Sequence, residues 1–229
     1  MSVSPVVAVV DYGMGNRRSV QKALEHVGAR AQITRDHAAL RDADAVVVPG
    51  VGAFPHGMRN LVELGLDEQI RGAAQAGKPV LGICLGMQLL FSRSREHALT
   101  EGLGLIGGEV SPIDAGGLRV PHIGWNEVTF VRGSPLTAAL PASGCPFYHV
   151  HSLAAHPDDP DDVVATTTYG ERFATVVARD NVYGVQFHPE KSSADGLTLL
   201  GAFVVMAAGG DGGLDGTPAR AWGGSAITT

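Results

Sequence analysis

The sequence has few cysteines and no long hydrophobic run. Cys84 and Cys145 are its only cysteines, and neither belongs to a CxxC or CxxH pair. A disulfide framework or a zinc site is therefore not expected. No window approaches the roughly 20 apolar residues that a membrane-spanning helix needs, and no basic region precedes the short apolar run near the N-terminus. We therefore expect a cytoplasmic protein that does not enter a membrane.

Positive charge is also scarce. Lys and Arg together number 17 against 23 Asp and Glu, and the formal net charge is -6. Binding to a phosphate backbone requires a basic surface, so nucleic acid is not an expected partner. Hydrophobic residues make up 45% of the 229 residues, which is enough for one sizeable core.

The first half alternates short β-branched runs with helical patterns. Apolar runs at 6–10, 29–34, 45–48 and 80–83 predict strands, and Pro49 should close the third because proline cannot donate to a sheet ladder. Helical patterns lie between them, the longest over 58–76. Strands separated by helices indicate a mostly parallel sheet flanked by helices, which is an α/β fold.

The second half is rich in predicted strands and should be partly antiparallel, with a final helix over 195–207. The glycine-rich segment that follows lacks periodicity. We expect a single domain over 1–208 and a disordered tail over 209–229.

Cys84 stands where an apolar strand changes into a helical pattern, in the sequence Gly-Ile-Cys-Leu-Gly at 82–86. A nucleophile on a sharp strand-to-helix turn needs small residues two positions away on either side. The following helix N-terminus favours a thiolate, and the amide of Leu85 can stabilise an oxyanion. A buried core thiol is the alternative interpretation of this segment alone.

His188 and Glu190 provide the groups that such a nucleophile requires. His188 ends an apolar strand, and Glu190 follows two residues later, so in an extended chain both side chains point to the same side. Glu190 could then orient the imidazole as the third member of a triad. A surface turn with a solvated carboxylate is the alternative.

The stretch PGVGAF, 49–54, follows the third predicted strand. Its glycines allow the chain to turn the amide of Val51 or Gly52 inward as a second oxyanion donor. The alternative is an ordinary glycine-rich turn.

His149 and His151 share one face of a predicted strand and raise the possibility of a metal site, but no third ligand follows at a recognisable spacing. No metal and no cofactor are therefore expected. Gln88 lies one helical turn after Cys84 and could bind an amino-acid head group; otherwise it is a polar residue at the rim.

The sequence resembles the class I glutamine amidotransferases, whose triad is Cys, His and Glu. Cys84, His188 and Glu190 occupy those positions. Within this class it is similar to the glutaminase subunits of imidazole glycerol phosphate synthase over about residues 5–206. The motifs that carry the resemblance are DYGMGN (11–16), PGVGAF (49–54), GICLGMQLLF (82–91), PHIGWNEV (121–128) and GVQFHPEKS (184–192).

The resemblance implies a flavodoxin-like domain that hydrolyses L-glutamine through a thioester on Cys84. It further implies a heterodimer with a cyclase subunit, a (β/α)8 barrel that receives the ammonia and forms imidazole glycerol phosphate in histidine biosynthesis. In such pairs the glutaminase is nearly idle until the cyclase is loaded, and the peptide at Val51 is the oxyanion switch.

By the same resemblance Gln88, His151 and Ser152 should line the glutamine site, and Asn16, Trp125 and Lys191 should lie near the cyclase. Two positions depart from the expected pattern: Leu153 replaces an aromatic residue, and Arg17 replaces an apolar one. Two alternatives remain open, namely the glutaminase of a different amidotransferase and a catalytically silent subunit on the same fold.

Overall fold

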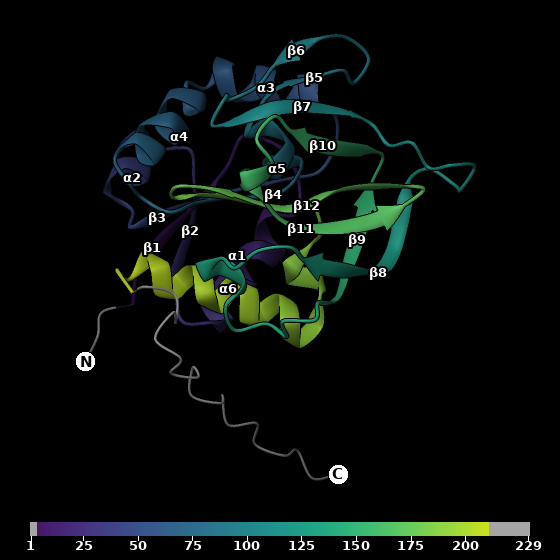
Figure 1. The fold of residues 1–229 in the computed structure, drawn as a ribbon. Helices are drawn as coiled ribbons and strands as arrows, with labels where there is room; N and C mark the ends of the chain where they lie inside the picture. Colours follow the sequence, from purple (N-terminus) through teal and green to yellow (C-terminus); the bar gives the residue numbers. More distant parts are fainter. Residues whose placement is uncertain (1–3, 211–229) are drawn as a thin grey trace, which may run out of the picture.

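The computed structural model describes residues 4–210, and all but the first two residues of the predicted tail, 209–229, lie outside the described part. Within this part, thirteen strands form one branched sheet. Helices lie on both sides of its N-terminal half (Figure 1).

The helices are α1 (Arg17–His26), α2 (His37–Asp42), α3 (Phe54–Glu63), α4 (Leu66–Gln75), α5 (Leu85–Leu89) and α6 (Ser193–Ala207), with 3-10 turns η1 (Pro135–Thr137), η2 (Pro160–Asp162) and η3 (Pro189–Lys191). The strands are β1 (Val6–Val10), β2 (Arg30–Thr34), β3 (Ala45–Gly50), β4 (Val80–Cys84), β5 (Phe91–Ser94), β6 (Thr100–Glu101), β7 (Ile106–Pro112), β8 (His122–Phe130), β9 (Cys145–His151), β10 (Leu153–Pro157), β11 (Val163–Tyr169), β12 (Glu171–Arg179) and β13 (Val182–Val185).

The main path of the sheet runs β2-β1-β3-β4-β13-β12-β10-β7-β5-β6, and β11, β8 and β9 branch from β12. The five strands from β2 to β13 are parallel, whereas β12 pairs antiparallel with β13, β10 and β11. The prediction of a mostly parallel sheet with a partly antiparallel second half is confirmed. Because β3, β4 and β13 are parallel neighbours, their carboxyl ends meet at one edge, where ligands bind in open α/β sheets.

Alternate residues of the parallel strands pack on opposite helix layers. Val7 and Val9 face the core that includes α1 and α6, whereas Ala8 and Val10 face the core that includes α2, α3 and α4. The two helix layers are visible below and above the sheet in Figure 1. Burial on both faces explains why these strands are continuous hydrophobic runs rather than alternating ones.

Two details of the predicted first half are wrong. The helical pattern over 58–76 is two helices, because the chain turns at Gly65, which has a left-handed φ of 62°. Strand β3 does not end at Pro49 but continues to Gly50. It pairs with β1 only as far as Val47, so the missing N–H of Pro49 costs no hydrogen bond on that side.

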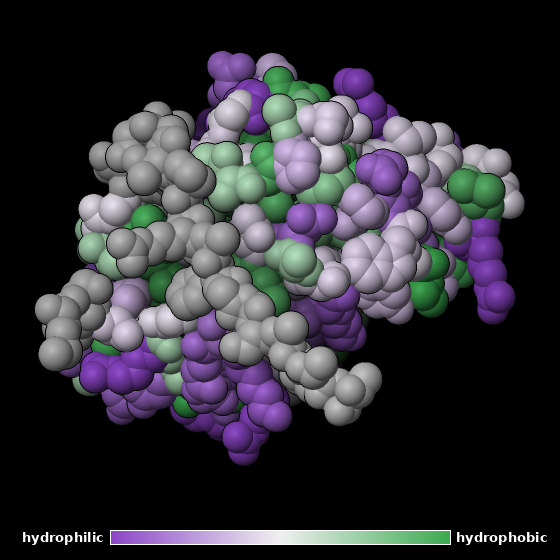
Figure 2. Space-filling view, turned by 90° about the horizontal axis from the view of Figure 1, so that it is seen from below, coloured by the Kyte–Doolittle hydropathy of each residue, from purple (hydrophilic) through white to green (hydrophobic). Residues whose placement is uncertain are grey.

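The surface seen from the α6 side is mixed. Figure 2 shows polar side chains along the lower edge of this view, with hydrophobic ones in small groups elsewhere. No helix in the described range 4–210 is long and apolar enough to cross a membrane.

Candidate active site

Cys84 is the last residue of β4 and the residue that precedes α5. Its backbone has φ 55° and ψ -112°, a strained conformation for a residue with a side chain. The turn needs glycine nearby: a Cβ on Gly86 would lie 1.7 Å from the carbonyl oxygen of Val48, and one on Gly82 would lie 2.6 Å from that of Gly86. The predicted strand-to-helix elbow is therefore present.

His188 follows β13, the parallel neighbour of β4, and its side chain lies between Cys84 and Glu190. Its Nδ1 donates to Glu190 Oε1 at 2.8 Å, and Cys84 lies close enough to the ring to raise its pKa. The backbone is held as well, since the amide of His188 donates to the carbonyl of Tyr148 and the hydroxyl of Ser192 donates to the carbonyl of His188. The three predicted triad residues thus lie together.

Burial of His188 by itself lowers the pKa of the imidazole. The hydrogen bonds to Cys84 and Glu190 and their negative charge act in the opposite direction and raise this pKa to about 10. The ring is therefore protonated at neutral pH. A protonated imidazole can stabilise a thiolate and can give its proton to a leaving amine.

Glu190 lies in the turn η3 rather than in an extended chain, and its side chain is fully buried. The side-chain amide of Asn16 donates to the same oxygen, Oε1, that receives the proton of His188. The second oxygen, Oε2, has no hydrogen-bond partner among residues 4–210. Asn16 was expected near the partner subunit, and here its side chain reaches into the triad.

The PGVG segment lies at the end of β3 beside Cys84, because Gly50 pairs with Cys84 in the sheet register. Gly52 has a left-handed φ of 112°, and Val51 is 39% exposed. Leu85, whose amide is the first predicted oxyanion donor, is buried directly after Cys84. The predicted donors thus lie on two adjacent strand ends.

Tyr12 holds the start of this segment. Its fully buried hydroxyl donates to the carbonyl of Pro49 at 2.7 Å, and it occupies the space that a Cβ on Gly50 would need. Burial, together with the charge of Cys84, raises the pKa of Tyr12 well above its ordinary value. The hydroxyl therefore stays protonated and remains a donor.

Gln88 and Gln186 lie beside the sulfur of Cys84. The amide nitrogen of Gln88 donates to Gln186 Oε1 at 2.9 Å, and Gln186 Nε2 is 3.8 Å from Cys84 Sγ. The carbonyl oxygen of Val150 lies 3.7 Å from the sulfur and can accept its proton when it is a thiol. Gln88 is buried rather than a residue at the rim.

A cluster of three buried histidines adjoins this site. Asn126 donates to His122 Nε2, so His122 Nδ1 donates to His151 Nε2, and His151 Nδ1 donates to the carbonyl of Leu153. His149 bonds the carbonyl of Phe147 and the hydroxyl of Thr175. Every ring nitrogen has a hydrogen-bond partner, which disfavours the metal interpretation. In the described range, no group of three or more His, Cys, Asp or Glu side chains is arranged so that it could hold a metal ion.

Burial is the main cause of the low pKa values in this cluster. It lowers the pKa of His149 to about 3, with help from the other two rings, and that of His151 to about 4; the pKa of His122 is lowered as well. All three are neutral at pH 7. Ser152 is exposed beside them, and both ring nitrogens of His151 are already in use.

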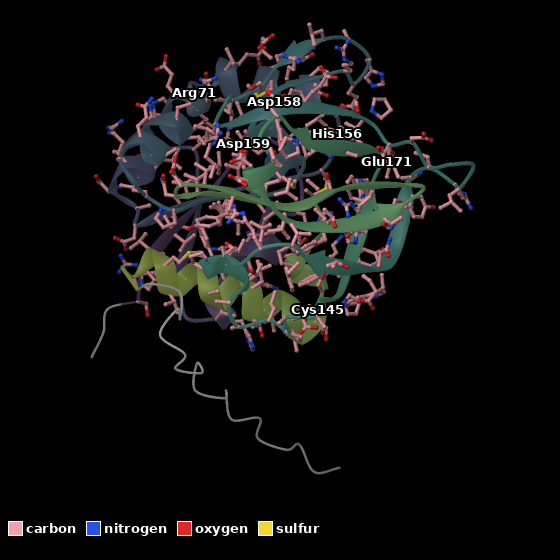
Figure 3. The ribbon with its side chains drawn as sticks, viewed as in Figure 1. Arg71, Cys145, His156, Asp158, Asp159 and Glu171 are labelled. Carbon is pink, nitrogen blue, oxygen red and sulfur yellow. The ribbon has the colours of Figure 1, made fainter. Side chains whose placement is uncertain are left out.

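Cys145 is the second cysteine and begins β9. It lies beside α6 (Figure 3) and is buried. Burial and the nearby carboxylate of Asp195 raise the pKa of Cys145 to about 11. It is therefore a thiol at neutral pH and a poor nucleophile.

Trp125 and Lys191, both expected near the partner, are exposed. The ring of Trp125 meets that of Tyr148, whose carbonyl accepts from the amide of His188. Ile123 is 59% exposed and, two residues before Trp125 on β8, points the same way. We refer to Ile123 and Trp125 as the β8 apolar pair.

Tyr12, Gln186 and Asn126 were not among the predicted site residues. Only Gln186 carried a signal in the sequence, because a polar residue inside the apolar strand GVQF must find a buried partner.

The match to the family model "Glutamine amidotransferase class-I" covers residues 8–206. The chain belongs to this family, with glutamine amidotransferase activity. Among curated proteins it is 49% identical over 197 residues to the imidazole glycerol phosphate synthase subunit HisH of Moorella thermoacetica, covering 86% of this chain and 93% of that protein. The HisH subunit of Aquifex aeolicus is 48% identical, covering 85% and 94%. Within the family, the chain belongs with these HisH subunits, as the resemblance predicted.

Solved structures agree on the fold. A crystal structure of a glutamine amidotransferase has a TM-score of 0.70 at 20% identity, covering 89% of this chain and 98% of that one. PurLQS from Thermotoga maritima has a TM-score of 0.69 at 22% identity, covering 90% and 98%. At these identities the likeness shows the fold of a class I glutamine amidotransferase.

Proposed function

We propose that Cys84, His188 and Glu190 hydrolyse the side-chain amide of L-glutamine. The observation that carries the proposal is the position of His188, whose ring bonds Glu190 and lies close enough to Cys84 for that residue to raise its pKa. A thiol, a base and an orienting carboxylate in this order form a nucleophilic triad.

In the first half-reaction, the sulfur of Cys84 forms a bond to the amide carbon and the carbonyl becomes an oxyanion. The carbon–nitrogen bond then breaks, and ammonia leaves with the proton of His188. In the second half-reaction, neutral His188 takes a proton from water, which attacks the thioester carbon. The carbon–sulfur bond breaks, glutamate leaves, and the proton returns to the Cys84–His188 pair.

The oxyanion in both steps would be held by the amide of Leu85 and by an amide of the PGVG segment, Val51 or Gly52. Leu85 is suited to this because its amide begins α5, where the helix dipole favours negative charge. The glycines on each side of Val51 make a peptide rotation there inexpensive. Such a rotation would let a partner control the rate.

Gln88, His151 and Ser152 would line the glutamine site. Gln88 uses its amide nitrogen on Gln186, which leaves its carbonyl oxygen to accept from the substrate. His151 has both ring nitrogens in use and would contribute shape rather than a ring hydrogen bond.

The partner would be a cyclase subunit that accepts the ammonia in the cytoplasm and makes imidazole glycerol phosphate. Support comes from the name of the HisH relatives, which describes them as subunits of imidazole glycerol phosphate synthase. Trp125 of the β8 apolar pair is exposed, and its ring meets that of Tyr148, whose carbonyl accepts from the amide of His188. Lys191 is exposed directly after Glu190, whose carboxylate also accepts from Asn16. Exposed aromatic residues near a site are typical of interfaces.

Glutaminase assays with and without the cyclase test the chemistry. Cys84→Ala should lower glutamate release at least about a thousandfold, because the nucleophile is lost. Cys145→Ser is the matched control and should retain activity. Equal release by Cys84→Ala and the parent would remove Cys84 from the reaction.

Co-purification with the cyclase, followed by glutamine-dependent product formation, tests the partner. A complex that forms imidazole glycerol phosphate from glutamine is expected. An active glutaminase that neither binds the cyclase nor transfers ammonia to it would have a different client.

A further inference from the structure

Gln186 is a buried amide with both ends in use. It lies two residues before His188, directly after β13, and is fully buried. Its backbone amide donates to the carbonyl of Thr175, which anchors the residue in the sheet. Its side chain leaves the sheet toward the sulfur of Cys84 and toward Gln88 on α5.

The two ends of this amide have different partners. Gln186 Oε1 accepts a hydrogen bond from Gln88 Nε2 at 2.9 Å. The opposite end, Nε2, presents an N–H to Cys84 Sγ at 3.8 Å. A buried donor held in this way is preorganised, so no side chain has to reorder when charge develops on the sulfur.

We propose that Gln186 is a further catalytic residue, a neutral N–H donor that stabilises negative charge on Cys84 Sγ. The proposal rests on Cys84 being the nucleophile. His188 takes a proton from the attacking water as the tetrahedral intermediate forms, and it is protonated when that intermediate collapses. The carbon–sulfur bond then breaks and the sulfur leaves with the electron pair. Gln186 provides a second side-chain donor to that sulfur, and its N–H does not depend on the protonation state of His188.

Removal of this donor should slow thioester hydrolysis more than it weakens glutamine binding. Gln186→Met replaces the amide with an apolar chain of similar length. Gln186→Glu keeps an acceptor for Gln88 but turns an oxygen toward the sulfur. Both variants, in complex with the cyclase, should show kcat reduced about tenfold or more with KM changed less, as expected for loss of a hydrogen bond to a charged group.

Acid quench followed by mass spectrometry of the intact chain should show more glutamyl thioester in both variants than in the parent. In both variants the rate of Cys84 alkylation by iodoacetamide should also reach half its maximum at a pH about one unit higher than in the parent, because the thiolate has lost a donor. Thr175→Val is the matched control. It removes the buried hydrogen bond between the Thr175 hydroxyl and His149, which does not involve Cys84. It should therefore leave the alkylation profile unchanged.

Unfolding curves show whether each variant folds. If Gln186→Met does not, the test uses Gln186→Glu, which keeps the hydrogen bond from Gln88. Parent-like kcat, thioester level and alkylation profile in a folded variant would overturn the role of Gln186 while Cys84→Ala remains inactive. An active Cys84→Ala would overturn the proposed function itself, so the two failures are distinguishable.

Discussion

Asn16 and Glu190 are 174 positions apart in the sequence, and the side-chain amide of Asn16 donates to the carboxylate oxygen that also receives the Nδ1 proton of His188. Asn16 precedes α1 in a left-handed conformation, with φ 68°, and its side chain makes no hydrogen bond to that helix. Asparagine tolerates this backbone conformation better than most residues. The first βα connection therefore helps to position Glu190 and, through it, His188, the proposed catalytic base.

Loss of the Asn16 amide should impair catalysis without unfolding the protein. Asn16→Gly keeps the left-handed backbone at no steric cost, and we expect kcat to fall roughly tenfold with little change in KM, because a hydrogen bond to a charged group is lost. Asn16→Asp should lower kcat further, since it places a second carboxylate beside Glu190. Steady-state glutaminase assays in the cyclase complex measure both effects.

Asn181→Ala is the control for these variants. Its amide donates to the carbonyls of Ala74 and Lys78, at the opposite ends of the parallel strands. It should reduce the free energy of unfolding and leave kcat unchanged. A parent-like kcat in Asn16→Gly would mean that Glu190 needs no support from the side chain of Asn16.

The elbow should tolerate no side chain at Gly86. A methyl group there would meet the carbonyl of Val48, and because that atom belongs to the backbone of β3, α5 would have to move. We expect Gly86→Ala to lower the free energy of unfolding by about 3 kcal/mol. Urea unfolding followed by circular dichroism measures it.

Gly72→Ala provides the comparison for Gly86→Ala. Gly72 is exposed in α4, and nothing lies within 4 Å of the added carbon. This variant should gain about 0.5 to 1 kcal/mol, because alanine loses less backbone entropy than glycine in a helix. Equal stability of Gly86→Ala and the parent would contradict the tight packing of α5 against β3.

The residues that short patterns predict are those whose partners are close in sequence or lie on adjacent strand ends. Cys84 follows from the glycine spacing of its elbow, and His188 with Glu190 follows from their separation by one residue. The backbone between His188 and Glu190 differs from the predicted extended chain, because the turn η3 brings Glu190 to the imidazole ring. Local patterns thus selected three residues that lie together in the fold, without describing their backbone.

The residues that the sequence did not reveal act over long separations. Tyr12 and Pro49 meet across 37 positions, and Gln88 and Gln186 across 98. Such contacts depend on the order of strands in the sheet, which hydrophobic periodicity alone does not determine. The break at Gly65 was missed for a related reason, since one left-handed glycine hardly disturbs an apolar pattern that spans two helices.

The buried histidines should make the protein sensitive to acid. The folded pKa values of His149, about 3, and His151, about 4, lie below the ordinary 6.5, so the unfolded chain binds more protons as the pH falls. Above pH 6.5 both histidines are neutral in the folded and the unfolded chain, so their titration does not affect stability there. Below pH 6.5 the free energy of unfolding should fall, by about 2 kcal/mol for each histidine at pH 5.

His149→Phe tests the sign of this effect. Phenylalanine fits beside Phe187 but cannot titrate, so the free energy of unfolding should fall less steeply between pH 6.5 and 5 than in the parent. The comparison concerns the slope, since the variant also loses the bond to Thr175 and should be less stable at pH 7. Parallel slopes would show that His149 does not contribute to the acid response.

The β8 apolar pair should contribute to affinity for the cyclase. Trp125 is 54% exposed, and its ring meets that of Tyr148 in a T-shaped arrangement. Buried aromatic residues carry much of the binding energy at interfaces, so Trp125→Ala should weaken the complex by roughly 10- to 100-fold in Kd. Val205→Ala, which alters an exposed apolar residue in the last turn of α6, is the control and should bind as the parent does. Isothermal titration calorimetry measures both.

Trp125→Ala should also reduce the stimulation of glutaminase at saturating cyclase, because Tyr148 connects Trp125 to the backbone of His188. Weakened binding with full stimulation would mean that Trp125 contributes to affinity alone.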